Sequence, residues 1–100
     1  MKYLITISSR IGTEVPKPND PPKLFAAVQA WNQLGLDEGR FDCVYGFSAG
    51  RGGVSIVNAD SHEDLMRILR SSPMYHFANY DIQSLCDINT FWDIHLEAIS

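Results

Sequence analysis

Apolar and polar residues follow two periods along this chain, one typical of strands and the other typical of helices. The run Lys2–Ser8 is apolar at nearly every position and rich in β-branched residues, which predicts a strand covered on both faces. Two extended runs, Arg40–Phe47 and Gly53–Asn58, are joined by a glycine-rich segment of hairpin length and predict an antiparallel pair. In Phe77–Leu85 polar residues alternate with apolar ones, which predicts a fourth strand with one polar face.

Three other segments show helical spacing of apolar residues. The first helix is predicted to begin after Asp20, which can cap it ahead of two prolines, and to end near Gly35. The second begins at the capping residue Ser61 and is stopped by Pro73. The third follows Asp87 and has a polar side opposite its apolar side. The apolar positions of the first and third helices are Leu24, Val28, Trp31 and Leu34, and Ile88, Phe91, Trp92, Leu96 and Ile99.

The segment Arg10–Pro22, between the first strand and the first helix, contains four prolines together with Gly12, Asn19 and Asp20. This composition predicts an irregular loop that is longer than most connections in a small domain. Loops of this length often cover functional sites.

The predicted order is strand, helix, strand, strand, helix, strand and a final helix. This is the split βαβ order of a ferredoxin-like α+β domain, in which both helices cover one face of the sheet. The other face is left apolar, and the second strand offers it Phe41, Cys43, Tyr45 and Phe47. Soluble monomers seldom expose such a patch, so we expect a homodimer or a higher homo-oligomer built as a dimeric α+β barrel.

Composition narrows the class of protein. The 100 residues, 45% hydrophobic and 20% charged, predict one domain over residues 1–100. A net charge of −4 with scattered lysines and arginines argues against nucleic acid as a partner. The N-terminal apolar run Tyr3–Ile7 is too short for a signal peptide, and no apolar stretch reaches membrane-spanning length, so we expect a cytoplasmic protein without a membrane partner. Cys43 and Cys86 are expected to be buried, reduced thiols.

The glycine-rich segment between the second and third strands contains two short motifs. Gly46–Gly50 matches the G-x-S-x-G pattern that places a nucleophilic serine between a strand and a helix, but here a strand is predicted to follow Ser48. Gly50–Gly53 lacks the lysine and the following helix of a phosphate-binding loop. Both motifs therefore indicate a hairpin turn, in which Arg51 remains free to orient an acidic group at the mouth of a pocket.

His62, His76 and His95 share no spacing with each other, or with cysteines and acids, that is typical of a metal site. We therefore expect no metal, and no cofactor motif is present. His76 lies among aromatic residues just before the fourth strand, where an imidazole with a near-neutral pKa would suit proton transfer. The alternative is an ordinary surface or core histidine.

Several aromatic residues lie on predicted faces that should converge. A pocket with apolar walls and a few hydroxyl groups would suit a small ring-containing ligand, although core packing alone accounts for most of these residues. The set is Tyr3, Trp31, Tyr45, Phe47 and Tyr80.

The second half of the chain resembles the muconolactone isomerase family. The resemblance is carried by Gly53–Ser61, the helix after it, and Pro73-Met74-Tyr75-x-Phe77, and it covers about residues 53 to 88. It implies a ferredoxin-like subunit, an oligomer of paired sheets and, in the named member, a cofactor-free proton shift within an unsaturated lactone. The family pattern has a small apolar residue or proline where His76 stands. The first half agrees only in the order of its elements.

These observations lead to a first hypothesis of a cofactor-independent isomerase or cyclase. It would transfer a proton or rearrange a ring in a small unsaturated lactone, phenolic or polyketide-like substrate. His76 would be the acid–base group and Tyr45 would donate a hydrogen bond to the developing enolate oxygen. The ligand would be held by Tyr3, Trp31, Arg51 and Tyr80.

Two alternatives remain open. One is a cofactor-free oxygenase of the dimeric α+β barrel type, which oxygen uptake with a phenolic substrate would reveal. The other is a non-catalytic accessory dimer that binds a small molecule without changing it. Function belongs to the site rather than to the fold, so the geometry of the site must discriminate among the three.

Overall fold

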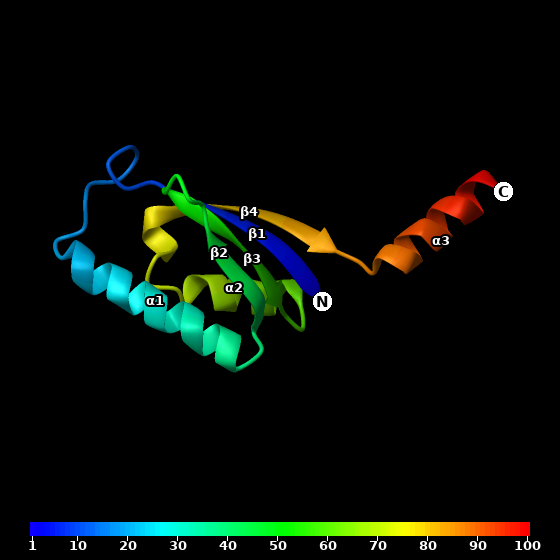
Figure 1. Cartoon of the computed structure of the whole chain (residues 1–100), viewed down its shortest axis with the longest axis horizontal. Coiled ribbons are helices and arrows are strands. Elements are labelled where there is room, and N and C mark those ends of the chain that lie inside the picture. Colours follow the sequence, from blue (N-terminus) through cyan, green and yellow to red (C-terminus); the bar gives the residue numbers. More distant parts are fainter.

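A computed structural model describes residues 1–100 as a four-stranded antiparallel sheet with three α-helices. The strands lie in the order β2-β3-β1-β4, and α1 and α2 cover one face of the sheet (Figure 1). The predicted ferredoxin-like α+β fold with an added C-terminal helix is thereby confirmed. The elements are β1 Lys2–Ser9, α1 Pro21–Asp37, β2 Phe41–Gly46, β3 Gly52–Asn58, α2 His62–Arg70, the short 3-10 helix η1 Tyr75–Phe77, β4 Ala78–Leu85 and α3 Ile88–Ile99.

The helices begin where the capping residues predict. Asp20 accepts a hydrogen bond from the backbone N–H of Lys23 at 3.2 Å, and Asp87 accepts one from that of Thr90 at 3.0 Å. Ser61 accepts one from the backbone N–H of Asp64 at 3.0 Å. Each cap satisfies a backbone donor that the first turn of a helix leaves without a partner.

The end of α1 differs from the prediction. Gly35 does not end the helix but is buried in its last turns, where an added Cβ would lie 2.3 Å from the ring of Phe41. The chain turns instead at Gly39, whose φ of +75° is the left-handed conformation that glycine adopts most easily. Gly35 is therefore a contact point between α1 and β2, and it lets the Phe41 ring pack against the helix.

The core lies between the sheet and the two helices that cover it. Ile5 at the centre of β1 is fully buried, and Val57 of β3 is 1% exposed. Leu65 and Leu69 of α2 complete this cluster from the helical side. Burying such side chains is worth about 1.5–3 kcal/mol each.

A β-bulge interrupts β2 and changes which face its side chains occupy. Phe41 pairs with Val57, but Cys43 pairs with Ile56, so one extra residue lies between the two pairs. Side chains of a regular strand alternate between faces, and an extra residue reverses the alternation beyond it. Phe41 therefore points toward the helices, whereas Cys43 and Tyr45 point to the other face of the sheet. Cys43 is for this reason only half-buried, and Cys86 is exposed, so the expectation of two buried thiols is wrong.

The loop from residue 10 to residue 20 begins with a tight turn. The carbonyl oxygen of Arg10 accepts hydrogen bonds from the backbone N–H groups of Thr13, Glu14 and Val15. The Glu14 carboxylate accepts a further bond from the Arg10 side chain at 2.7 Å and one from Asn79 of β4 at 3.5 Å. These contacts lower the pKa of Glu14, the Arg10 hydrogen bond most of all. The first part of the loop is thus tied to the sheet.

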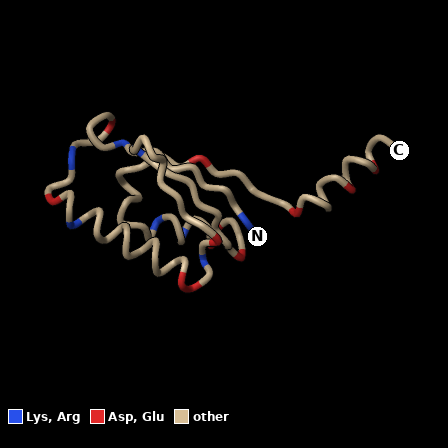
Figure 2. Tube along the Cα trace, in the orientation of Figure 1, with Lys and Arg blue, Asp and Glu red and all other residues tan.

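The terminal helix α3 extends away from the rest of the molecule (Figure 1). All of its residues are exposed, including Trp92 at 55% and Ile99 at 82%. Its charged residues are all acidic, in contrast with the mixed charges elsewhere in the chain (Figure 2). None of the helices is long and apolar enough to cross a bilayer.

Candidate ligand-binding site

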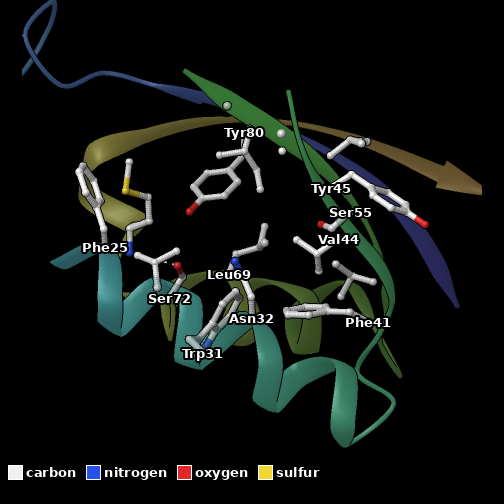
Figure 3. A pocket seen from close by; sticks show the side chains of 18 residues that line it. Phe25, Trp31, Asn32, Phe41, Val44, Tyr45, Ser55, Leu69, Ser72 and Tyr80 are labelled. Carbon is white, nitrogen blue, oxygen red and sulfur yellow. Dashed lines mark hydrogen bonds between the residues drawn. The ribbon is translucent and has the colours of Figure 1, made fainter. Parts of the chain in front are cut away.

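A cavity of about 250 Å³ lies between the sheet and α1 (Figure 3). Its walls are mainly apolar, and its polar side chains are few, as is typical of small-molecule sites. Every strand of the sheet contributes at least one residue. The lining includes Ile7, Phe25, Val28, Trp31, Asn32, Phe41, Val44, Tyr45, Gly46, Gly52, Gly53, Val54, Ser55, Val57, Leu69, Ser72, Met74 and Tyr80.

Aromatic rings form the wall on the side of α1. The rings of Trp31 and Phe41 have centroids 5.1 Å apart and are tilted by 58°. The indole N–H of Trp31 donates to the Ser71 hydroxyl at 3.1 Å, which fixes the ring and satisfies its polar atom outside the cavity. Trp31 therefore offers a ligand an apolar surface rather than a hydrogen bond.

Tyr80 of β4 brings a phenol into the cavity, toward α1 (Figure 3). Burial raises the pKa of Tyr80; a hydrogen bond with Ser72 opposes this effect, and the neighbouring Tyr75 adds to it. The rings of Tyr75 and Tyr80 stack with centroids 5.9 Å apart. At neutral pH the Tyr80 hydroxyl is thus protonated, and it can donate a hydrogen bond to an oxygen atom of a ligand.

Three other polar side chains line the cavity: Asn32, Ser55 and Ser72. Sequence reasoning did not single them out. Asn32 lies four residues after Val28 on the same side of α1. A polar residue on an otherwise apolar helical face is the signal from which its place in the cavity could have been predicted. Ser55 is 5% exposed and alternates with apolar neighbours on β3, which gave no comparable signal.

The aromatic residues grouped from the sequence divide between different places. Trp31 and Tyr80 line the cavity, but Tyr3 is 2% exposed and belongs to the core. The Tyr3 hydroxyl lies 2.6 Å from Nδ1 of His62, at the start of α2. Its hydrogen bond is therefore made within the fold rather than to a ligand.

The Tyr45 side chain points away from the cavity (Figure 3). It is 67% exposed, because the bulge after Phe41 turns it to the face opposite the helices. Within one copy of the chain, the Tyr45 phenol and the Tyr80 phenol lie on opposite faces of the sheet.

His76 lies on η1 and is exposed. Its ring meets that of Tyr75 edge to face, with centroids 5.3 Å apart, and it does not line the cavity. Its neighbours Met74 and Tyr80 do line it, so His76 belongs to the segment that forms one wall.

Arg51 lies at the tip of the β2–β3 hairpin, beside a second hollow that adjoins the cavity. It donates a hydrogen bond to the carbonyl oxygen of Ile11 in the loop, at 3.2 Å. A strand, not a helix, follows this glycine-rich segment, so Ser48 and the neighbouring glycines form a hairpin turn. No group of three or more histidine, cysteine or acidic side chains is arranged to hold a metal ion.

The arrangement of the sheet and helices can be compared with solved structures. The chain has the fold of muconolactone isomerase. The crystal structure of that enzyme matches with a TM-score of 0.75 and 17% sequence identity, over 87% of this chain and 90% of the isomerase chain. The family resemblance noted from the sequence is thus confirmed as a likeness of fold. No protein-family model and no curated protein sequence matches the chain.

A second solved structure has the same fold. It is 5-chloro-2-hydroxyhydroquinone dehydrochlorinase from Burkholderia phenoliruptrix AC1100, in complex with 2,5-dihydroxybenzoquinone. The TM-score is 0.64 and the identity 17%, over 90% of this chain and 98% of the dehydrochlorinase chain. The likeness spans nearly the whole length of the isomerase chain and of the dehydrochlorinase chain.

Proposed function

We propose that this protein binds a small ring-containing molecule in the cavity and catalyses a cofactor-independent proton transfer or ring rearrangement on it. The observation that carries the proposal is the Tyr80 phenol, protonated in an apolar cavity that is otherwise poor in polar groups. A hydrogen-bond donor in such surroundings stabilises negative charge on a reacting oxygen far better than water does. An unsaturated lactone or a phenolic ketone would develop that charge when it loses a proton.

The volume and the similar structures support this class of substrate. A cavity of about 250 Å³ is small for a ligand site and suits a molecule of one or two rings. The enzymes that share the fold are named for a lactone and a hydroxyhydroquinone, both small oxygenated molecules. On this proposal Tyr80 donates to the substrate oxygen, the role first assigned to Tyr45, and Trp31 packs against the ring.

The proposed reaction also needs a residue that accepts the proton. No residue that lines the cavity has a side chain that ordinarily titrates between pH 5 and 8. We assign the role to His76. In the sequence it lies between the lining residues Met74 and Tyr80, and its imidazole is not hydrogen bonded. It would take a proton from carbon and return it to a different carbon, so the substrate mass would not change.

The same absence of a base from the lining favours one alternative, a binding protein that holds a ring-containing molecule without converting it. Such a protein needs the apolar walls and the Tyr80 donor but no proton acceptor. It would bind the ligand as tightly as the enzyme would, and His76 would have no effect on it.

Incubation with candidate substrates separates these readings. The protein would be screened against unsaturated lactones, phenols and polyketide-like aromatic compounds, with thermal shift for binding and mass spectrometry with chromatography for conversion. We expect at least one compound to stabilise the protein and to return a product of unchanged mass. Oxygen uptake with a gain in mass would indicate an oxygenase, and stabilisation without any product would indicate the binding protein. A lack of both would contradict the proposal.

The active form on this proposal is a homodimer. The face of the sheet opposite the helices is not covered by any element of the chain (Figure 1). Register places Leu4, Val54 and Ile56 on it beside Tyr45. The apolar residues of α3 are also uncovered. A second copy would cover both surfaces, and soluble monomers seldom leave extended apolar patches bare.

A charge in the apolar side of α3 should dissociate this dimer. We expect Trp92→Glu to shift the protein from a dimer to a monomer, because a buried carboxylate at the contact would lack a partner. Size-exclusion chromatography with light scattering would measure the mass. Asn89→Glu adds the same charge to the polar side of the same helix and should remain dimeric. A monomeric wild-type protein, or a dimeric Trp92→Glu variant, would refute this role of α3.

A further inference from the structure

A hollow of about 410 Å³ adjoins the cavity at the end nearest the loop and the hairpin tip. The two spaces share the lining residues Ile7, Phe25, Gly52 and Met74, so the hollow forms the mouth of the cavity. Its lining contains Lys17 and Arg51 but no acidic residue. Two cations in a protein of net charge −4 are therefore gathered at the entrance to an apolar site.

Neither cation is neutralised within the chain. The salt bridges join Lys2 to Asp42, Arg10 to Glu14 and Arg40 to Glu38, and none involves Lys17 or Arg51. Arg51 makes one hydrogen bond, to the backbone oxygen of Ile11. That bond holds the guanidinium against the loop and leaves its other N–H groups free, as an anion site requires.

The backbone at Arg51 supports a role for its side chain. Arg51 has a φ of +67° and is the only residue other than glycine with a positive φ. The left-handed conformation is unfavourable for L side chains, and such strain is commonly retained at functional positions. Gly50 and Gly52 on either side also have positive φ, which glycine adopts readily. A glycine at position 51 would likewise relieve the strain, but it would remove the guanidinium.

Lys17 is held by its local sequence. It lies between Pro16 and Pro18, and a residue before proline is restricted to extended backbone conformations. The loop also begins with the hydrogen-bonded turn at Arg10, and its acids are engaged elsewhere: Glu14 by Arg10 and Asn79, and Asp20 by the first turn of α1. The backbone at Lys17 is thus already restricted, so that binding a ligand costs little backbone entropy there.

We infer that Lys17 and Arg51 bind the carboxylate of a free ring-containing acid whose ring enters the apolar cavity. This rests on the proposed function, because it assumes that the cavity is the ligand site, and it narrows the substrate class to small organic acids. The ring lies against Trp31 and Tyr80, and the carboxylate remains at the mouth. A neutral analogue of the same shape binds more weakly because it cannot pair with either cation.

Calorimetric titration with 2-naphthoate and 2-naphthamide tests the inference, since the two probes share a ring system and differ in charge. We expect naphthoate to bind about tenfold more tightly at low salt, the size of one good charged hydrogen bond. The preference should shrink when salt is raised, because these cations are accessible to water. It should fall to about twofold or less in the Lys17→Ala, Arg51→Gly double variant.

Single variants separate charge from structure. Arg51→Gly should lose most of the preference while melting at the same or a higher temperature, because glycine relieves the strain at this position. Arg51→Lys should retain part of the preference, and Arg67→Gln, which removes a cation from α2, should retain all of it. Equal binding of both probes to the wild-type protein would overturn the anion site and leave the cavity as the ligand site. Binding of neither probe at millimolar concentration would overturn both.

Discussion

Replacing Gly52 with alanine is expected to destabilise the protein by about 3 kcal/mol or more, a large share of the 5–15 kcal/mol typical of a small domain. An added Cβ would lie 2.0 Å from the carbonyl oxygen of Ile7, and the atom it meets belongs to the backbone of the neighbouring strand. The φ of +157° at Gly52 adds strain for any other residue. Strands β1 and β3 would have to separate at the point where they form the mouth of the cavity.

Urea unfolding at a fixed protein concentration would measure the change, with two matched glycine-to-alanine controls from the same hairpin. At Gly50 the φ is +88° but nothing lies within 4 Å of an added Cβ, so Gly50→Ala reports backbone strain alone, about 1 kcal/mol. At Gly46 there is neither a positive φ nor a neighbour, so Gly46→Ala should be within about 0.5 kcal/mol of the wild type. If Gly52→Ala proved no worse than Gly50→Ala, the close approach to β1 would not be the reason for this glycine.

Local chemistry made the elements of the fold predictable. The capping residues Asp20, Ser61 and Asp87 mark the start of all three helices, and each makes the expected hydrogen bond. The end of α1 was less predictable because two glycines follow one another closely. Gly35 serves a tertiary contact with Phe41 and Gly39 serves the turn, and only the three-dimensional structure distinguishes these two uses of the same residue.

The candidate site was harder to predict than the fold, since it depends on which face each strand residue occupies. A regular β2 would place Phe41 and Tyr45 on the same face, and the sequence contains no signal for the bulge that separates them. The alternation of β4, which has no bulge, placed Tyr80 on the apolar face with Ile82, and its register opposite Ile7 and Ile5 of β1 agrees. One extra residue in one strand thus decides which tyrosine reaches the cavity.

Loss of the Tyr80 hydroxyl is expected to have the largest effect on catalysis. With the substrate that the screen identifies, Tyr80→Phe should lower kcat about 100-fold or more, the usual effect of removing one donor from a site that stabilises a reacting oxyanion. The variant keeps the ring and its stacking against Tyr75, so ligand binding should change much less. A rise in KM alone, with kcat unchanged, would mean that Tyr80 only holds the ligand.

Two tyrosines provide matched controls for the same loss of a hydroxyl. Tyr75→Phe removes a phenol stacked on Tyr80 but outside the cavity lining, and Tyr45→Phe removes one on the opposite face of the sheet. Both should retain nearly full kcat; a loss in Tyr45→Phe equal to that in Tyr80→Phe would return the donor role to Tyr45.

The pH dependence provides an independent check on Tyr80. Because burial raises the pKa of Tyr80, the phenol keeps its proton through neutral and mildly alkaline pH, and its ionisation should limit turnover only above pH 10, the ordinary value for tyrosine. Spectrophotometric titration at the wavelength of tyrosinate absorption should show a component that ionises late, and Tyr80→Phe should reduce its amplitude. A late component of the same amplitude in Tyr80→Phe and in the wild type would show that Tyr80 does not contribute to it.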